Sequence, residues 1–394
     1  MTHLTKSPHK TRHDQLPPKR DNKWAPIGKL GAWIFFWLVL IDLGINLLFP
    51  FPKESTQTPS AFESYFDYGR SIESKLERMV KNEVTNSDPI VASGWIAPKT
   101  WQPLPQAPQI DHDLLVAVYG MSFANQAARA LADVDGKITL RMIAGPSAPP
   151  SHSFAAFMAD TEGKDADVAM MGILASSVKR MRSISGMNWT YEHPAPYTYP
   201  HYTVEQDELV AVEPVIMTAD EFVEAFNNRD ENWQRLQQQM KQYDAPFDAF
   251  VFHENLTDHS AIVRLIRRGW ANRQRGLSEA GLYDLREGFN PDASEIQTLK
   301  VMLTEFVATA RASGQTPVIL LINNQGYSAH LHEVLSAHVE SLDALMLSTH
   351  TIVPSDDPRN FIADGHFTPE ANQKIGQALQ KIIRKELATH QDPG

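Results

Sequence analysis

The 394-residue chain contains no cysteine. This absence excludes disulfide bonds, zinc sites built on thiolates and a cysteine nucleophile. It is compatible with an oxidising compartment but does not establish one. The sequence also lacks a Walker loop, a Rossmann glycine fingerprint and an HExxH motif. We therefore expect neither a cofactor nor a resident metal.

Positive charge is scarce outside the N-terminus. Residues 1–29 hold seven Lys and Arg against two Asp, whereas the rest of the chain holds 29 Lys and Arg against 45 Asp and Glu, a net charge of −16. So acidic a body repels a phosphate backbone, which argues against nucleic-acid binding. Residues 1–29 form a basic cytoplasmic tail, and the polar composition of residues 1–28 predicts disorder.

One long apolar run, residues 30–51, reads LGAWIFFWLVLIDLGINLLFPF. As a helix it would extend roughly 33 Å, enough to cross a bilayer. Asp42 is its only charge, and Trp33 near its start suits a membrane interface. The basic residues precede the run, so we expect a single-pass anchor in the cytoplasmic membrane, with the N-terminus inside and the body periplasmic or extracellular.

Two alternatives to an uncleaved anchor remain at this stage. A cleaved signal peptide would have a shorter apolar core and a small-x-small cleavage site, and no such site follows residue 51. A buried core helix would not explain a basic flank on one side only. The anchor is therefore the favoured interpretation.

Beyond the anchor, residues 52–110 predict a linker with helical and extended parts, residues 111–388 the main domain, and residues 389–394 a tail. From residue 111, short apolar runs alternate with helical spacing, as in a parallel sheet covered on both faces. The candidate strands are Leu114–Tyr119, Ile138–Ile143, Val168–Gly172, Ala249–Phe252 and Val318–Ile322.

The helical patterns between these strands complete an α/β rhythm, which predicts a three-layer α/β domain. Residues 184–218 are rich in aromatics and proline and interrupt the rhythm, so we expect an insertion there. The candidate helices are Ala124–Val134, Ile173–Arg182, Ala219–Tyr243, Ser260–Arg275, Ile296–Ala312, Ala329–Ser341 and Pro369–Leu387, the last capped by Thr368.

Ser122 follows the first candidate strand directly, in the segment LLVAVYGMSF. Ligands bind at the carboxyl ends of the strands in open α/β sheets, and a helix N-terminus there offers N–H groups to an oxyanion. A serine nucleophile needs a histidine base oriented by a carboxylate. Asp364 and His366, just before the last predicted helix, are the candidates. The alternative for Ser122 is an ordinary helix N-cap.

YGMSF after the first strand and DGHFTPEAN before the last helix resemble the SGNH (GDSL-type) hydrolase superfamily over residues 111–388. The resemblance implies a flavodoxin-like α/β/α sandwich that hydrolyses or transfers esters. It also implies that Ser122 is the nucleophile, His366 the general base and Asp364 its orienting acid.

The sequence departs from the family pattern at the oxyanion hole and the triad. The resemblance assigns backbone N–H donors to Ser122 and Gly145, but Leu174 stands where the family has an asparagine. Asn255, Asn323 and Asn324 follow later candidate strands and are substitutes, although turn or cap roles are commoner for asparagine. Met121 replaces the family's aspartate, and Asp364 and His366 are two residues apart where three is commoner.

Other patterns favour structural roles. The GxSxG motif of α/β-hydrolases is absent because GMSFA ends in alanine. His330, His332 and His338 lack the spacing of a helical metal pair, which favours a solvated helix face. A basic stretch within the helix predicted at 260–275 favours a solvent-facing charged side rather than an anion site; its members are Arg264, Arg267, Arg268, Arg273 and Arg275.

Two hypotheses of function follow. The first is a membrane-anchored serine esterase or O-acyltransferase acting on acyl, most simply acetyl, esters of a cell-surface or exported polysaccharide. The second is a catalytically weak SGNH-like protein that binds glycan or scaffolds an envelope polysaccharide assembly, as the missing asparagine suggests. The expected partners are the membrane and a carbohydrate or acyl-ester substrate, and the sequence identifies no protein partner.

Overall fold

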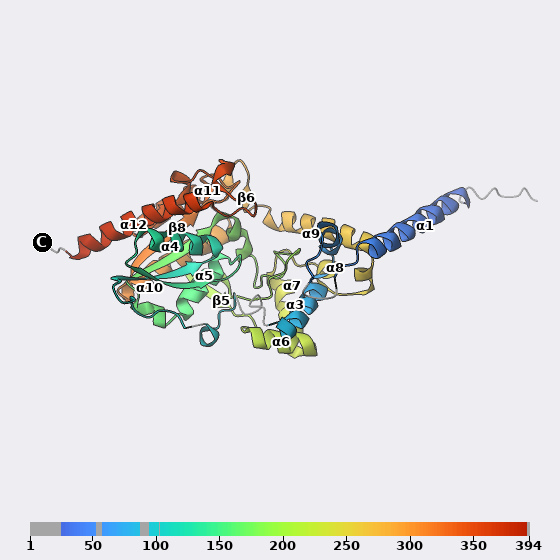
Figure 1. Cartoon of the computed structure of the whole chain (residues 1–394), viewed down its shortest axis with the longest axis horizontal. Helices are drawn as coiled ribbons and strands as arrows, with labels where there is room; N and C mark the ends of the chain where they lie inside the picture. The colour runs from blue at the N-terminus through green and yellow to red at the C-terminus, as the bar shows by residue number, and fades with distance from the viewer. Residues whose placement is uncertain (1–24, 53–56, 87–93, 102, 392–394) are drawn as a thin grey trace, which may run out of the picture. The chain divides into compact units, whose positions relative to one another are not determined.

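The computed structural model describes residues 25–52, 57–86, 94–101 and 103–391, so the expected basic tail lies almost wholly outside the described residues. The chain divides into two units, Met1–Pro50 and Phe51–Gly394 (Figure 1). In the first unit, α1 runs from Ala25 to Leu48. Its segment Lys29–Leu48 is long and apolar enough, by length and composition, to cross a membrane. We call this segment the candidate span.

The second unit contains a five-stranded, all-parallel sheet in the order β2-β1-β3-β8-β9. Four of the five strands were predicted from their apolar runs, because a sheet buried on both faces leaves no polar alternation. The strands are β1 (Leu114–Gly120), β2 (Ile138–Ala144), β3 (Val168–Leu174), β8 (Thr316–Ile322) and β9 (Leu345–Ser348).

Alternate residues of these strands pack against helices on opposite faces of the sheet. On one face, Val116 and Val118 share an apolar cluster with α4 (Ser122–Val134) and α12 (Pro369–Gln391). On the other face, Leu115 and Ala117 pack with three further helices. These are α5 (Pro150–Ala159), α10 (Ser294–Ala312) and α11 (His330–Ser341). We call this assembly the α/β lobe.

A third apolar cluster joins helices that precede β1 to helices that lie between β3 and β8 in the sequence, and we call this group the helical lobe. Ile72, Leu76 and Val80 lie in this core, so α3 belongs to the compact unit, although the sequence placed it in a linker. The helices of the cluster are α3 (Ile72–Asn86), α6 (Ala219–Asn228), α7 (Glu231–Tyr243), α8 (Ala249–Phe252) and α9 (Ala261–Glu279), and α2 (Ala61–Asp67) contacts α9.

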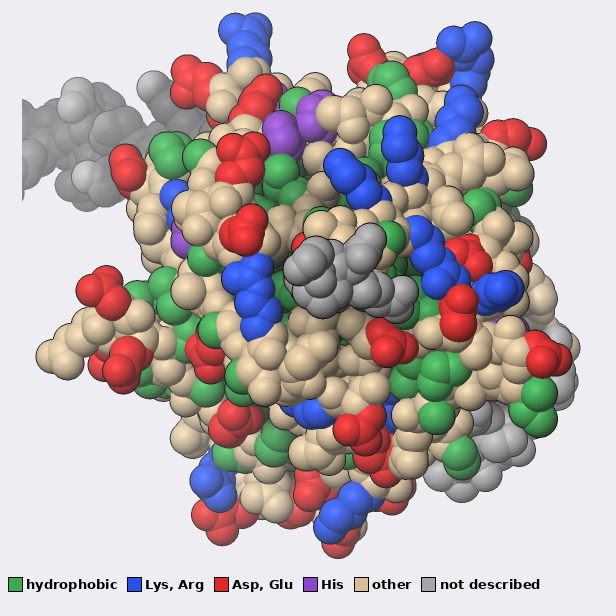
Figure 2. Space-filling view, turned by 90° about the vertical axis from the view of Figure 1, so that its left-hand side faces the viewer, with side chains coloured by type: hydrophobic (Ala, Val, Ile, Leu, Met, Phe, Trp, Pro, Cys, Tyr) green, Lys and Arg blue, Asp and Glu red, His purple; other side chains and the backbone are tan. Residues whose placement is uncertain are grey.

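The predicted insertion at 184–218 contains an antiparallel hairpin of β4 (His201–Glu205) and β5 (Glu208–Val212). A shorter antiparallel pair joins β6 (Tyr283–Asp284) and β7 (Gly288–Phe289). Figure 2 views the α/β lobe from the end where α12 finishes, and on this face Lys and Arg side chains are interspersed with Asp and Glu. Apolar side chains there are scattered between the charged ones.

Three predictions about elements were wrong. Ala249–Phe252 is the short helix α8, because the Asp248 side chain accepts the N–H groups of Phe250 and Val251 and starts a helical turn. The long helix expected at 219–243 is two helices, broken at Arg229, whose φ of 50° is left-handed. The helix expected from Ile173 is a 3-10 segment, Ala175–Met181, because β3 continues to Leu174.

Candidate active site

Ser122 is the first residue of α4, directly beyond the carboxyl end of β1. The alternative that Ser122 caps this helix is wrong, because the N-cap is Met121, whose backbone is extended and whose side chain makes no capping bond. The serine hydroxyl is therefore not used by the helix. β1 and β3 are neighbours in the sheet, but the chain leaves β1 toward one edge of the sheet and β3 toward the other. Such a topological switch point is where open α/β sheets bind ligands.

Two glycines let the first turn of α4 lie directly on the ends of β1 and β3. A Cβ added to Gly120 or to Gly172 would fall 2.5 Å from the Cβ of Ala124. That separation is too short for two carbon atoms, so side chains at these positions would push the helix away from the sheet. Gly120 and Gly172 thereby fix the height of Ser122 above the sheet.

His366 is carried by a tight turn just before α12. The N–H of Ile362 donates to the carbonyl of His366 at 2.8 Å, and a β-bridge between Phe361 and Phe367 closes the loop. Gly365 has a φ of 87°, a left-handed conformation that glycine adopts without steric cost. α12 begins as predicted, with the N–H of Ala371 donating to the Thr368 hydroxyl at 3.3 Å.

The structure brings Ser122 and His366 together. The Oγ of Ser122 lies 2.7 Å from the Nε2 of His366, a hydrogen-bond distance between residues 244 positions apart. α12 can approach α4 closely because Gly376 faces the backbone of Ala130, where a Cβ would fall 2.6 Å from the Ala130 carbonyl. The fold therefore satisfies the first geometric requirement for a serine nucleophile with a histidine base.

Asp364 approaches the other side of the imidazole. Its Oδ1 lies 3.1 Å from the Nδ1 of His366, within ion-pair distance, but the direction of approach is not that of a hydrogen bond. The same oxygen accepts the backbone N–H of His366 at 3.0 Å. This backbone bond is the main reason that the pKa of Asp364 lies below its ordinary value, and the nearby imidazole adds to the effect. The carboxylate is 63% exposed.

A residue that the sequence reasoning missed supports the imidazole. Phe123 stacks on His366 with ring centroids 4.5 Å apart and planes inclined by 22°. Phe367 meets Phe123 edge-on at 5.4 Å. No motif marks Phe123, and only its position next to Ser122 could have drawn attention to it.

The structure does not place Gly145 or Asn255 as free oxyanion donors beside Ser122. The backbone N–H of Gly145 donates to the carbonyl of Gly120 at 3.3 Å, so it is already engaged. Asn255 does not follow a sheet strand; its side chain caps the 3-10 turn Leu256–His259 by accepting the N–H of Thr257. The candidate donors that remain at Ser122 are the N–H groups of the first turn of α4, which a helix leaves without intrahelical partners.

The two later asparagines are also used elsewhere. Asn323 is fully buried and donates to the Ser348 hydroxyl at 3.0 Å. The Oδ1 of Asn324 accepts the N–H of Ser176 at 3.2 Å, which ties the ends of β8 and β3 together. Both therefore hold strand ends in place.

The histidine and arginine clusters differ from expectation. His330 bonds to Tyr283 at 3.0 Å, and His338 to the Lys300 carbonyl at 2.8 Å, so they contact other elements rather than form a solvated face. Arg264 and Arg267 are buried. Among the residues that the structure describes, no group of three or more His, Asp and Glu is placed to hold a metal ion.

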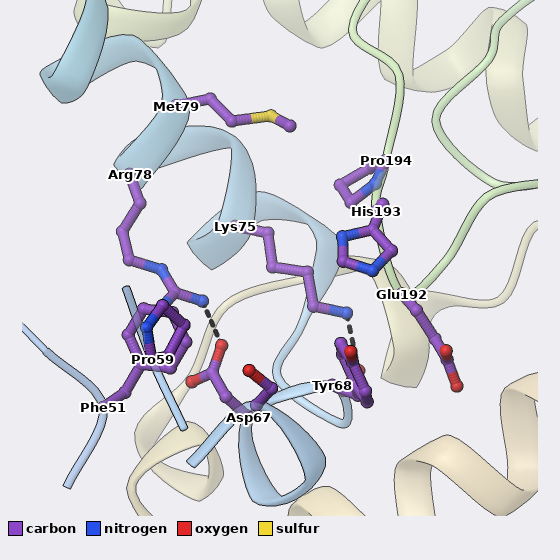
Figure 3. A pocket seen from close by; sticks show the side chains of 11 residues that line it. Phe51, Pro59, Asp67, Tyr68, Lys75, Arg78, Met79, Glu192, His193 and Pro194 are labelled. Atoms are coloured by element: carbon purple, nitrogen blue, oxygen red, sulfur yellow. Dashed lines mark hydrogen bonds and ion pairs between the residues drawn. The ribbon is translucent and has the colours of Figure 1, made fainter. Parts of the chain in front are cut away.

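A separate cavity of about 220 Å³ lies between α2, α3 and the segment around His193, and Figure 3 shows its lining. Lys75 points across it and donates to the carbonyls of Tyr68 at 2.7 Å and Tyr191 at 2.6 Å. Burial holds the pKa of Lys75 well below its ordinary value. Arg78 pairs with Asp67. Both cations of this cavity are thus bonded within the protein, which favours a structural role.

No family model matches the chain, and neither a curated protein nor a solved structure matches it at a significant level.

Proposed function

We propose that this protein is a membrane-anchored serine esterase or O-acyltransferase of the SGNH type. The observation that carries the proposal is the 2.7 Å contact between Ser122 Oγ and His366 Nε2 at the carboxyl edge of the sheet. Asp364 within ion-pair distance of Nδ1 adds the third member of a triad. Its substrate class would be acyl esters, most simply acetyl esters, of a cell-surface or exported polysaccharide.

The flavodoxin-like, three-layer architecture is part of the same proposal. Counted along the chain, the sheet strands lie in the order 2-1-3-4-5, which is the flavodoxin-like order. Helices of two apolar clusters pack on its two faces. Both observations support the resemblance drawn from YGMSF and DGHFTPEAN.

In the proposed reaction, Ser122 Oγ attacks the acyl carbonyl while its proton passes to Nε2 of His366. The negative oxygen of the tetrahedral intermediate faces the N–H groups that begin α4. The intermediate collapses to an acyl-enzyme, and the leaving alkoxide takes the proton from His366. Water or a sugar hydroxyl then attacks the acyl carbon and gives its proton to His366. The bond to Ser122 Oγ breaks, and His366 returns the proton to Oγ, which restores the starting state.

The location is proposed from the candidate span and its basic N-terminal flank. Seven Lys and Arg precede the apolar run, so the N-terminus would stay in the cytoplasm and the body would face the periplasm or the exterior. This side of the membrane gives access to exported glycans, which motivates the choice of substrate.

Release of p-nitrophenol from p-nitrophenyl acetate by the full chain in detergent tests the activity. Ser122→Ala should lower the rate by more than about 10³-fold, since the acyl-enzyme cannot form. Ser176→Ala is a matched control, because it follows a neighbouring strand and contributes to the Asn324 contact through its backbone N–H only. Equal rates for wild type and Ser122→Ala would refute the proposal.

A second candidate is a catalytically weak protein of the same fold that binds glycan or scaffolds a polysaccharide assembly. The engaged N–H of Gly145 favours it, because one lost oxyanion donor lowers a rate on the order of 10²–10³-fold. This candidate predicts no turnover of an acetylated polysaccharide but retained binding of it by both wild type and Ser122→Ala, measured by calorimetry.

A further inference from the structure

α9 is an amphipathic helix with its polarity reversed. Arg264 and Arg267 are only 5% and 0% exposed, whereas Ile266, Trp270 and Leu277 are 59%, 38% and 59% exposed. The three apolar residues are spaced by four and seven positions, which places them on one stripe of the helix. We call this stripe the α9 apolar stripe.

Buried ion pairs fix the rotation of the helix. Arg267 donates to Asp258 at 2.7 Å and to the Gly69 carbonyl at 3.3 Å. Asp258 in turn accepts the N–H of Ser71 at 2.6 Å. Arg264 lies 3.7 Å from Asp67. Turning the α9 apolar stripe inward would move Arg267 out of the core and leave the buried carboxylate of Asp258 without its arginine, which is strongly destabilising.

The surroundings of the stripe have the composition of a membrane interface. Trp270 bonds through its indole N–H to Asp248 at 3.0 Å, and Arg273 lies over the Trp270 ring at 5.6 Å. Arg273 and Arg275 are exposed, and Glu279 is the only acid on a helix with five arginines, although the body is acidic. Tryptophan beside arginine is enriched where proteins meet lipid headgroups, and exposed arginines attract anionic lipids.

The chain connection favours lipid over a protein partner. The candidate span ends at Leu48 and the second unit begins at Phe51, so only Phe49 and Pro50 separate them. Phe51 is held by Arg78 of α3, whose guanidinium lies 4.2 Å from its ring centre. Because so few residues separate them in the sequence, a membrane that holds the span cannot be far from the start of the second unit.

We propose that the α9 apolar stripe inserts into the headgroup region of the same membrane leaflet, with Arg273, which lies on the same side of the helix, bound to anionic headgroups. The stripe thus contacts a phospholipid surface, and this proposal does not depend on the ester chemistry at Ser122. It gives the protein a second membrane contact besides the span. The helical lobe would thereby present a fixed side to the membrane.

The cysteine-free chain allows a direct test with the full-length protein in lipid nanodiscs of phosphatidylcholine and phosphatidylglycerol. Single cysteines replace Ile266, Leu277 and, as a control, the exposed Gln377 of α12, and each carries the fluorophore NBD. Emission at 266 and 277 should shift to the blue and be quenched by brominated acyl chains, whereas emission at 377 should do neither. The Ser122→Ala background should give the same result.

Arg273→Glu supplies the second measurement, and Arg275→Glu, on the opposite side of α9, is its control. An arginine contributes about fivefold to binding at an anionic surface, so Arg273→Glu should reduce quenching at 266 in the mixed lipid and little in pure phosphatidylcholine, whereas Arg275→Glu should change neither. Emission at 266 and 277 like that at 377 overturns the proposal. A blue shift without lipid quenching also overturns it, because it indicates coverage by a second copy of the chain.

Discussion

The imidazole of His366 lies on the phenyl ring of Phe123, the residue that follows Ser122 in the sequence, with ring centroids 4.5 Å apart. One helical turn therefore carries both the candidate nucleophile and the surface on which the candidate base rests. The carboxylate of Asp364 is 63% exposed and does not form an aligned hydrogen bond with Nδ1. Ring stacking thus contributes to a position that a carboxylate alone holds in many triads.

Replacing Phe123 tests this positioning role. Phe123→Leu should lower kcat for p-nitrophenyl acetate on the order of 10- to 100-fold, because His366 loses the ring that aligns it. KM should change little, because the substrate-binding site is unaltered. Phe123→Tyr keeps the ring and should retain most of the activity. If Tyr and Leu reduce kcat equally, stacking does not position the base.

Replacing Asp364 should have a moderate effect. Asp364→Asn keeps an oxygen that can accept the backbone N–H of His366, now bonded at 3.0 Å, and removes only a solvent-exposed charge. We expect kcat to fall about tenfold, far less than the 10⁴-fold loss caused by replacing a buried triad carboxylate. A loss as large as that of Ser122→Ala would contradict this expectation. Steady-state rates of the two variants under one condition decide the matter.

The contact between Gly172 and Ala124 should control the height of Ser122. Gly172→Ala would bring two Cβ atoms to 2.5 Å, so α4 must shift and activity should fall on the order of 100-fold. Ala124→Gly in the same chain removes the clash and should restore most of the rate. Gly136→Ala, where the added Cβ meets nothing within 4 Å, is the control. Failure of the double variant to recover would show that the clash is not the cause.

His152 should make the protein less stable in acid. It is buried with Nε2 2.6 Å from the Gly94 carbonyl, and burial lowers its pKa from 6.5 to about 4. The unfolded chain therefore binds a proton between these values while the folded chain does not, and stability falls as the pH drops from 6.5 to 4. The loss is on the order of 3 kcal/mol.

Urea denaturation of His152→Gln at pH 7.5 and pH 4.5 checks this expectation. The variant should lose less of its free energy of unfolding between the two pH values than wild type does, since glutamine does not titrate. His259→Gln, at an exposed position, should behave like wild type. A wild-type pH dependence that persists in His152→Gln would assign it to other groups.

The sequence allowed the sheet and the Ser122–His366 pair to be predicted for the same reason. Strands buried on both faces are continuous apolar runs, and residues that follow parallel strands share one edge. The run at Ala249–Phe252 misled because four apolar residues fit a strand or a helical turn equally well, and the Asp248 cap decides between them. β9 has only four residues, and an apolar run of that length is too short to identify a strand from the sequence.

The ring stacking on His366 and the buried ion pairs of α9 could not be predicted. The stacking of Phe123 on His366 depends on how α12 packs against α4, which no local pattern contains. The burial of Arg267 and Arg264 on α9 depends on Asp258 and Asp67, because arginine side chains are buried only where acidic groups can pair with them. Periodicity reports which residues share a face, but the partners decide which face is buried.

The separation of Ser122 and His366 by 244 residues has a consequence for the order of events during synthesis. Protein chains are made from the N-terminus, so the serine emerges while most of the α/β lobe does not yet exist. Its base arrives only with the turn before α12, and α12 must then pack on α4. A chain interrupted before residue 366 lacks His366, so under the proposed function reactivity at Ser122 would report that the lobe has been completed.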